Sequence, residues 1–435
     1  MAIIKNVLLA TVIMGATQVC ADDLITSYQQ ALQEDPQLRS AELKVEVGAA
    51  QKGQALGQLL PQVSATGNWS DNTQVGYLPR GSNKSYPGTR YNISLTQSVF
   101  DFGKFWAWRQ SKEVENQYAS ELIEAQHILI LNVVKHYFDV LDAEDQLYLT
   151  QQERRATENE LAQVKRQFSK QLIKITDLYE VEARLDQIKA DEIEAESLLT
   201  IAKEGLKEMT NTPPLQLAKL RDDIEYKELE GELEDWIEVA KSENPLLASQ
   251  ASAIEAAKNN VALQKSGYLP VVDLQLNYID TDTGYQSIHY TQPYQTEMAA
   301  LNVTVPIFSG GTTTHRMYEA QSKLSISKED NEAKLRGLIK ETSDAFSSSN
   351  ANARRIKASE KALSSAVKSR QAMESSLKLG IETVADLLRA QQVEYKAKRE
   401  FSRSKYEYIT NRMRFFKALG TINEDNLIEI NSWLK

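Results

Sequence analysis

The stretch "ITDLYEVEA", residues 175–183, decides the fold because a close echo of it, "VADLLRAQQ", occurs at residues 384–392. Asp177 and Asp386 occupy the same place in the two phrases and lie 209 residues apart. A phrase repeated at a fixed spacing indicates that one structural unit occurs more than once in a chain. The same spacing recurs at other landmarks of the sequence.

Landmarks along most of the chain share this offset. Leu60-Pro61 aligns with Leu269-Pro270 and Trp69 with Tyr278 at 209 residues, while "VFDFG" at 99–103 aligns with "IFSGG" at 307–311 at 208. A register held over so much sequence predicts an internal two-fold repeat. The predicted parts are a first repeat at 22–215, a linker at 211–234, a second repeat at 235–422 and a C-terminal tail at 423–435.

Each repeat contains two segments in which apolar and polar residues alternate, and period-two alternation predicts strands with one apolar and one polar face. The polar positions carry small Ser, Thr and Asn residues, which is typical of the lipid-out, water-in pattern of a membrane β-barrel. A small soluble sheet lying on a core is the alternative. The predicted strands span about 9 to 11 residues, and residues 71–90 and 279–296 are predicted to be exposed loops. The apolar positions that we predict to face lipid are Val63, Trp69, Ile93, Leu95, Leu274, Tyr278, Leu301 and Val303.

Four strands cannot close into a barrel, because unpaired strand edges are not tolerated in lipid and the smallest closed barrels need about eight strands. A barrel built from this chain must therefore be shared between subunits. Two chains give eight strands and three give twelve, and periodicity alone does not choose between them.

Long helical stretches separate the strand pairs. Residues 24–59 favour one helix that ends at Pro61, and residues 104–171 contain no Pro or Gly. At 1.5 Å per residue the second stretch spans about 100 Å, so such helices must lie side by side in a rod or tube. The predicted breaks lie at 171–175 and at 379–381, where Gly380 suits a helix end.

The repeated phrase therefore begins the return helix of each long hairpin. Thr176 and Thr383 lie near the two starts, and Asp177 and Asp386 lie in the first turns, where the helix dipole favours a carboxylate by about 0.3–1 kcal/mol. For Asp177, a duplicated helix start and a functional role are equally good explanations. For Asp386 we favour a role at the mouth of a pore.

The N-terminus predicts export beyond the inner membrane. Lys5, the apolar run 7–16 and Val19-Cys20-Ala21 are typical of a signal peptide at 1–21. Its removal takes away the single Cys and leaves 49 basic against 60 acidic residues. A chain that acidic is a poor nucleic-acid binder.

In this ordered set of motifs the sequence resembles the TolC family of outer membrane factors. The resemblance rests on the duplicated Leu-Pro pairs, "FDFG" at 100–103, "IFSGG" at 307–311 and the two tip phrases. It implies a homotrimer in which twelve strands form one outer membrane barrel and twelve helices continue as a periplasmic tube. It also implies a belt formed by linker and tail, and tips that meet a periplasmic adaptor and an inner membrane transporter. The implied gate at the hairpin tips comprises Thr176, Asp177, Gly380, Glu382, Asp386 and Arg389.

One feature of the tip departs from the pattern of some family members. Those members carry a second acid one turn after the tip Asp, whereas this chain has Arg389 there and Glu382 before it. Arg389 can pair with Asp386 at i,i+3 for a few tenths of a kcal/mol. That pairing softens the negative ring and puts cation blockade of the closed pore in doubt.

The sequence offers no support for an enzyme or a cofactor. The four His residues are scattered and form no spaced metal-ligand set. Phe102, Trp106 and Trp108 lie where strand passes into helix and are predicted to form an interfacial aromatic belt rather than a ligand site.

The function that the sequence favours is a passive export conduit, and a periplasmic coiled-coil scaffold is the alternative. Within the conduit class, efflux members of the family often bear a lipidated Cys. Bulky Gln18 and Val19 argue against lipidation at Cys20, so we favour type I protein secretion with an ABC transporter. Multidrug efflux with a proton-driven pump remains the alternative.

Overall fold

The computed structural model describes residues 22–74, 84–282 and 293–435, so the predicted signal peptide at 1–21 lies outside the described residues. The first elements are α1 (Leu24–Glu34), α2 (Pro36–Gly57), β1 (Gln62–Gln74), β2 (Lys84–Phe100), α3 (Phe102–Ser169) and α4 (Ile175–Thr210). They are followed by α5 (Leu233–Glu243), α6 (Pro245–Ser266), β3 (Val271–Asp282), β4 (Tyr294–Thr304), α7 (Thr312–Lys378), α8 (Val384–Leu419) and α9 (Glu424–Asn431).

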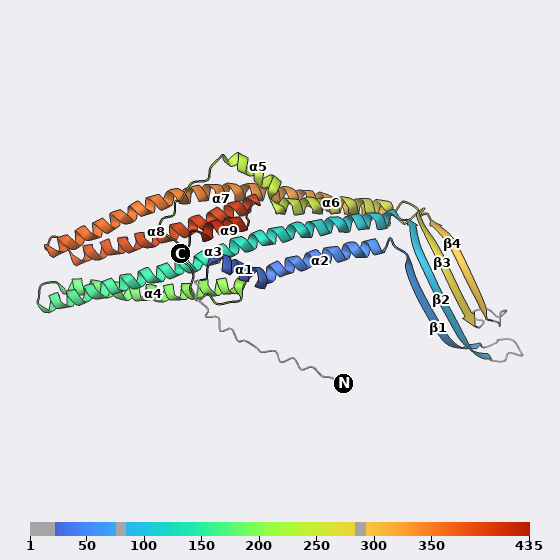
Figure 1. The fold of residues 1–435 in the computed structure, drawn as a ribbon, viewed down its shortest axis with the longest axis horizontal. Helices are drawn as coiled ribbons and strands as arrows, with labels where there is room; N and C mark the ends of the chain where they lie inside the picture. Colours follow the sequence, from blue (N-terminus) through green and yellow to red (C-terminus); the bar gives the residue numbers. More distant parts are fainter. Residues whose placement is uncertain (1–21, 75–83, 283–292) are drawn as a thin grey trace, which may run out of the picture.

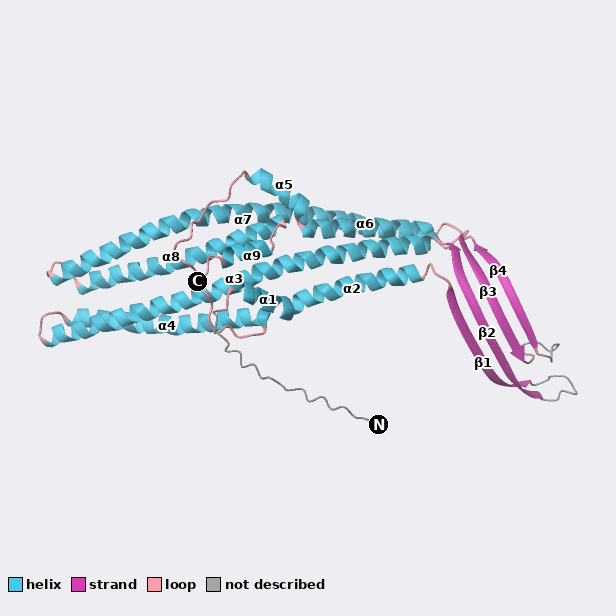
Figure 2. Ribbon diagram, in the orientation of Figure 1, coloured by secondary structure: helices cyan, strands magenta, loops and turns pink. Residues whose placement is uncertain are grey.

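The molecule is elongated, with a four-stranded sheet at one end and the tips of two helical hairpins at the other (Figure 1). The hairpins are α3 with α4 and α7 with α8, and the C-terminus lies between the sheet and the tips (Figure 2). At 68 residues α3 spans about 100 Å. The prediction of long helices lying side by side is confirmed.

The order of element types is the same in both halves of the chain: two helices, two strands and two long helices. The lengths also correspond, since α3 has 68 residues and α7 has 67, while α4 and α8 have 36 each.

The prediction of one helix over residues 24–59 is wrong, because the chain breaks at Asp35. The Asp35 backbone is extended, and its side chain accepts a hydrogen bond of 2.7 Å from the Leu38 amide, which caps α2. Pro36 occupies the first turn of α2, where its missing N–H costs nothing. An Asp-Pro pair in a helical pattern therefore ended one helix and began another.

The strands are longer than predicted. β1 runs to Gln74 and β2 starts at Lys84, so the predicted loop at 71–90 is wrong at both ends, and the loop at 279–296 is wrong in the same way. Cross-strand pairs continue along these polar stretches, and the Thr73 and Ser85 hydroxyls lie 2.8 Å apart. The middle of each loop, 75–83 and 283–292, lies outside the described residues. β4 ends at Thr304.

The sheet is antiparallel with the order β1-β2-β3-β4. Val63 pairs with Leu95, Leu95 with Leu276, and Leu274 with Leu301. Among the described residues β1 and β4 each pair with a single strand, so both are edge strands within one chain.

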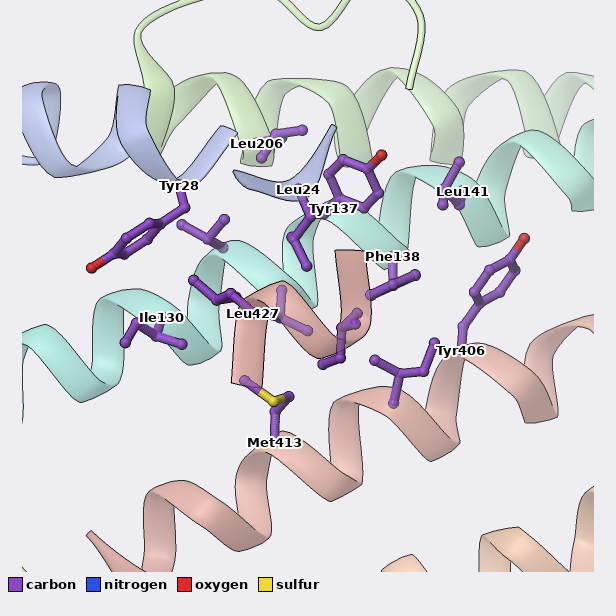
Figure 3. Packing of buried hydrophobic residues seen from close by; sticks show 14 of the residues in the cluster. Leu24, Tyr28, Ile130, Tyr137, Phe138, Leu141, Leu206, Tyr406, Met413 and Leu427 are labelled. Atoms are coloured by element: carbon purple, nitrogen blue, oxygen red, sulfur yellow. The ribbon is translucent and has the colours of Figure 1, made fainter. Parts of the chain in front are cut away.

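The largest apolar core lies at mid-length, where α1, α3, α4, α8 and α9 meet (Figure 3). Tyr137 and Phe138 of α3 are fully buried there, and Phe138 packs against Tyr406 of α8 at 5.8 Å between ring centroids. The Tyr137 hydroxyl lies 3.0 Å from the Ala218 carbonyl oxygen and 3.1 Å from that of Asp22. One buried side chain thus contacts the backbone of two distant segments.

Three chain segments that are far apart in the sequence meet around this core. Asp22 forms a parallel bridge with Leu217, and Leu220 forms an antiparallel bridge with Leu434. The Asn431 side chain accepts a 3.1 Å hydrogen bond from the Leu24 amide. The start of the described chain, the linker and the C-terminal tail therefore pack together.

We predict that Tyr137→Phe destabilises this junction by about 1–2 kcal/mol, because two buried backbone carbonyls lose a donor. The matched control is Tyr148→Phe in the same helix, since Tyr148 is 60% exposed. Thermal unfolding followed by circular dichroism of the detergent-solubilised protein measures the difference. Equal midpoints for the two variants would contradict the assignment.

Candidate functional site

The sheet has one apolar face, and the register places all eight predicted lipid-facing residues on it. Trp69, Leu301 and Val63 are 70%, 63% and 67% exposed in the single chain. The Trp69 indole donates a 3.1 Å hydrogen bond to the Tyr91 hydroxyl on the same face. Large apolar side chains on a continuous exposed face require another apolar surface to cover them.

The opposite face of the sheet is polar. The Ser64 and Ser94 hydroxyls lie 2.8 Å apart, and the Asn302 amide donates to the Gln275 oxygen at 3.1 Å. A surface hollow lies over β1 and β2, lined by Thr66, Asn68, Ser70, Gly88, Thr89, Arg90 and Asn92. Small hydrated side chains on the face opposite an apolar one are typical of a wall between lipid and water.

An aromatic cluster lies where β2 passes into α3, next to the sheet. Phe100 and Phe102 meet edge to face at 4.6 Å, and Phe105 contacts both Trp106 and Trp108. The structure therefore brings the predicted aromatics Phe102, Trp106 and Trp108 to this junction. Their role as an interfacial belt stays a prediction.

The tip of the second hairpin is capped at the start of α8. The Asp386 amide donates to the Thr383 hydroxyl at 3.3 Å, and the Asp386 carboxylate accepts from the Thr383 amide at 3.3 Å. The Thr383 hydroxyl also donates to the Asp386 carboxylate at 2.6 Å. This bond, and after it the bond from the Thr383 amide, holds the pKa of Asp386 below its ordinary value of 3.8. A carboxylate with a lowered pKa stabilises the cap above pH 3.8, and this contribution is lost as the pH falls through the lowered pKa. The predicted pair of Asp386 with Arg389 is confirmed at 3.3 Å.

The first hairpin tip has the same shape without this cap. Asp177 lies in the first turn of α4, but the residue before the helix is Lys174 and no side chain caps it. Thr176 reaches only the neighbouring Asp177 oxygen, at 3.5 Å. Gln171 and Gly380, which are 209 residues apart, both adopt positive φ, at 59° and 75°. The expected helix end at Gly380 is confirmed, and Gln171 takes that conformation without the freedom of glycine.

A groove of about 540 Å³ separates the two tips, and both hairpins of the chain line it. Of the predicted tip residues, Asp177, Gly380 and Glu382 line this groove, whereas Thr176, Asp386 and Arg389 do not. The structure thus brings together tip residues that lie about 200 positions apart in the sequence.

Sequence reasoning missed the acidic and basic groups on the groove walls, Glu160, Glu374 and Lys378. Burial, and after it the carboxylate of Glu374, raises the pKa of Glu160. The hydrogen bond from Lys378 is the main cause that lowers the pKa of Glu374. All three residues lie in helical stretches of the sequence, but only the packing of the two hairpins shows that they line the same groove.

Other kinds of site find little material in the described part of the chain. Within residues 22–74, 84–282 and 293–435, no group of three or more His, Cys, Asp or Glu side chains is placed to hold a metal ion. No helix among the described residues is both long enough and apolar enough to cross a membrane.

Comparison with known proteins decides the family. The sequence model of the outer membrane efflux protein family matches residues 27–212 and again residues 236–421. The chain belongs to this family. As a member of the outer membrane efflux protein family it is an outer membrane transport protein.

Individual known proteins are similar to this chain over nearly its whole length. Outer membrane protein TolC of Vibrio cholerae is 29% identical over 97% of this chain and 95% of its own length. Alkaline protease secretion protein AprF of Pseudomonas aeruginosa is 29% identical over 93% and 85%. The crystal structure of the Campylobacter jejuni CmeC outer membrane channel has a TM-score of 0.82 at 16% identity and covers 95% of this chain and 90% of that one.

We predict that Thr383→Ala speeds amide hydrogen exchange in the first turn of α8 about fivefold, since a helix cap is worth about 1 kcal/mol. Thr176→Ala is the matched control at the other tip, where threonine does not cap the helix. Hydrogen exchange of the purified full chain measures both variants. The assignment fails if Thr176→Ala loosens its tip as much as Thr383→Ala does.

Proposed function

We propose that this protein is the outer membrane channel of a tripartite export system and acts as a passive conduit. The observation that carries the proposal is the sheet register, which gives one apolar face and one hydrated face to strands that have open edges. An open edge in lipid leaves backbone N–H and C=O groups without partners, at a cost of several kcal/mol for each group. The conduit therefore forms only when copies of the chain pair β4 of one with β1 of the next.

The assembly that we propose is a homotrimer with a twelve-stranded barrel and a periplasmic helical tube of twelve helices. The resemblance to the TolC family supports three subunits over two. We further propose that each subunit is a two-fold internal repeat, which the two matched segments and the repeated element order support. Outer membrane lipid covers the apolar face, and the hairpin tips lie at the inner end of the tube.

The partners that we propose are a periplasmic adaptor and an inner membrane transporter that supplies the energy. The chain has no catalytic chemistry of its own in this scheme. The tip groove and its residues Asp177, Gly380 and Glu382 form the mouth that opens when the partners dock. Asp386 and Arg389 hold the start of α8 at that mouth.

For the cargo we propose secreted protein carried by a type I system with an ABC transporter. The likeness to AprF, which is named for alkaline protease secretion, supports this choice. The second candidate is efflux of small molecules with a proton-driven pump, which the name of the family favours.

The barrel proposal predicts opposite tolerance at two adjacent residues of β2. Ile93→Arg places a charge on the lipid face, which costs about 2–4 kcal/mol near the bilayer centre, whereas Ser94→Arg points into water. We expect Ile93→Arg to abolish the heat-sensitive oligomer in outer membrane extracts, and Ser94→Arg to leave it in place. Gel electrophoresis of unheated samples measures the oligomer. Equal loss in both variants, or recovery of the wild-type protein from the soluble periplasmic fraction, would overturn the barrel.

The cargo proposal predicts that a strain without this protein stops releasing a large protein into the medium. Quantitative mass spectrometry of the culture supernatant measures the loss, and a plasmid copy of the gene must restore it. Drug susceptibility of the same strain is the companion measurement. An unchanged supernatant together with increased drug sensitivity would favour the efflux candidate instead.

A further inference from the structure

Glu153 of α3 is a buried acidic residue whose side chain connects three helices in the described part of the chain. It is 4% exposed, and its carboxylate accepts hydrogen bonds from Arg184 of α4 at 2.5 Å and from Arg399 of α8 at 2.8 Å. Arg184 lies within the same hairpin as Glu153, whereas Arg399 belongs to the other hairpin. One carboxylate thus ties the α3/α4 hairpin to the α7/α8 hairpin.

The position of this tie along the tube is informative. On its sheet side Asp145 of α3 accepts hydrogen bonds from Ser402 and from Tyr406, the latter at 2.8 Å, and Lys417 pairs with Glu124 at 2.9 Å. Nearer to the tips than Glu153, no hydrogen bond or ion pair joins the two hairpins within the described residues. The contact there is the apolar cluster of Val164, Val181, Val384 and Leu388.

The two kinds of contact resist movement differently. Apolar contact is non-directional, so this cluster, and the partly buried apolar side chains that pack against it, can slide and repack at small cost. An arginine–carboxylate pair depends on distance and orientation, and separating a buried pair leaves a charge without its partner. From Glu153 the remaining 16 residues of α3 extend about 24 Å to the helix end. In the described part of the chain, no hydrogen bond or ion pair therefore joins the final stretches of the two hairpins.

We propose that Glu153 is a positioning residue for opening of the channel: it clamps α8 to α3 and sets the point beyond which the two hairpin tips can part. This inference rests on the proposed conduit function. The clamp keeps the sheet-side part of the tube fixed, while the tip segment opens the groove between Asp177 and Glu382. Loss of the clamp moves this point towards the mid-length core and lets the tips separate more often.

Two arginine variants test the clamp separately from the stability of Glu153. Arg399→Gln removes the bond between hairpins and leaves Glu153 paired with Arg184, so the acid is not left alone. Arg184→Gln is the matched control, because it removes the other arginine partner of the same carboxylate but leaves the hairpins joined. Arg399→Lys keeps a positive charge and tests whether charge at this position restores the clamp. Thermal unfolding of each variant shows that it is folded.

The direct measurement is the distance between the tips of one subunit. Spin labels at Leu172→Cys and Leu379→Cys suit it, since these tip side chains are 70% and 76% exposed and the native Cys20 lies in the predicted signal peptide. Double electron–electron resonance on the detergent-purified assembly, with labelled subunits diluted by unlabelled ones, reports the distance distribution. We expect Arg399→Gln to broaden and lengthen it, and Arg184→Gln and Arg399→Lys to match wild type.

Conductance in planar lipid bilayers supplies the functional measurement. We expect Arg399→Gln to raise the ratio of open to closed channel about tenfold, the factor that corresponds to about 1.4 kcal/mol. Wild-type tip distances and conductance in Arg399→Gln, or an equal change in Arg184→Gln, would overturn the clamp. A wild-type protein that forms no channels at all would overturn the conduit function instead, so the two failures are distinguishable.

Discussion

The constraint on which the structure depends is that backbone hydrogen bonds must be satisfied inside a lipid bilayer. The four strands of one chain pair with one another, but the outer edges of β1 and β4 have no partner in the described chain. A sheet with exposed edges and one apolar face is stable in lipid only when it closes on itself. A single chain cannot meet that requirement by itself, which explains why the apolar face of its sheet is exposed in the single chain.

The sheet is joined to the long helices by short connections along the chain. β2 is followed after Asp101 by α3, whose first turn Asp101 caps, and β4 leads through residues 305–311 into α7. The strands of the sheet thus lead into the two longest helices of the chain. Midway along these helices the Tyr137 and Phe138 core holds the start of the described chain, the linker and the tail against α3. The largest apolar core of the molecule thus lies at its middle.

The two hairpin tips both turn through a residue with positive φ but differ in how the return helix is capped. α8 has a reciprocal cap between Thr383 and Asp386, while Lys174, the residue before α4, provides no side-chain cap. Among the described residues, hydrogen bonds and ion pairs between the hairpins end at Glu153. Nearer to the tips an apolar cluster joins the hairpins and a groove lies between them. Among the described residues, polar contacts between the hairpins thus lie away from the tips, where the contact is apolar.

The sequence alone determined the order of the elements, the two faces of each strand and the breaks between the long helices. Period and punctuation are local properties: alternation sets the strand face, and Gly380 with its counterpart Gln171 marks a turn. The prediction from sequence was wrong in two places. Pairing between polar residues extended the strands beyond Ser70, and Asp35 capped a new helix. Only the tertiary structure decided that Glu160 and Glu374 share a groove and that Glu153 meets Arg399, 246 positions away. Such contacts depend on how the hairpins pack against each other, and no spacing within one helix encodes the partner on another.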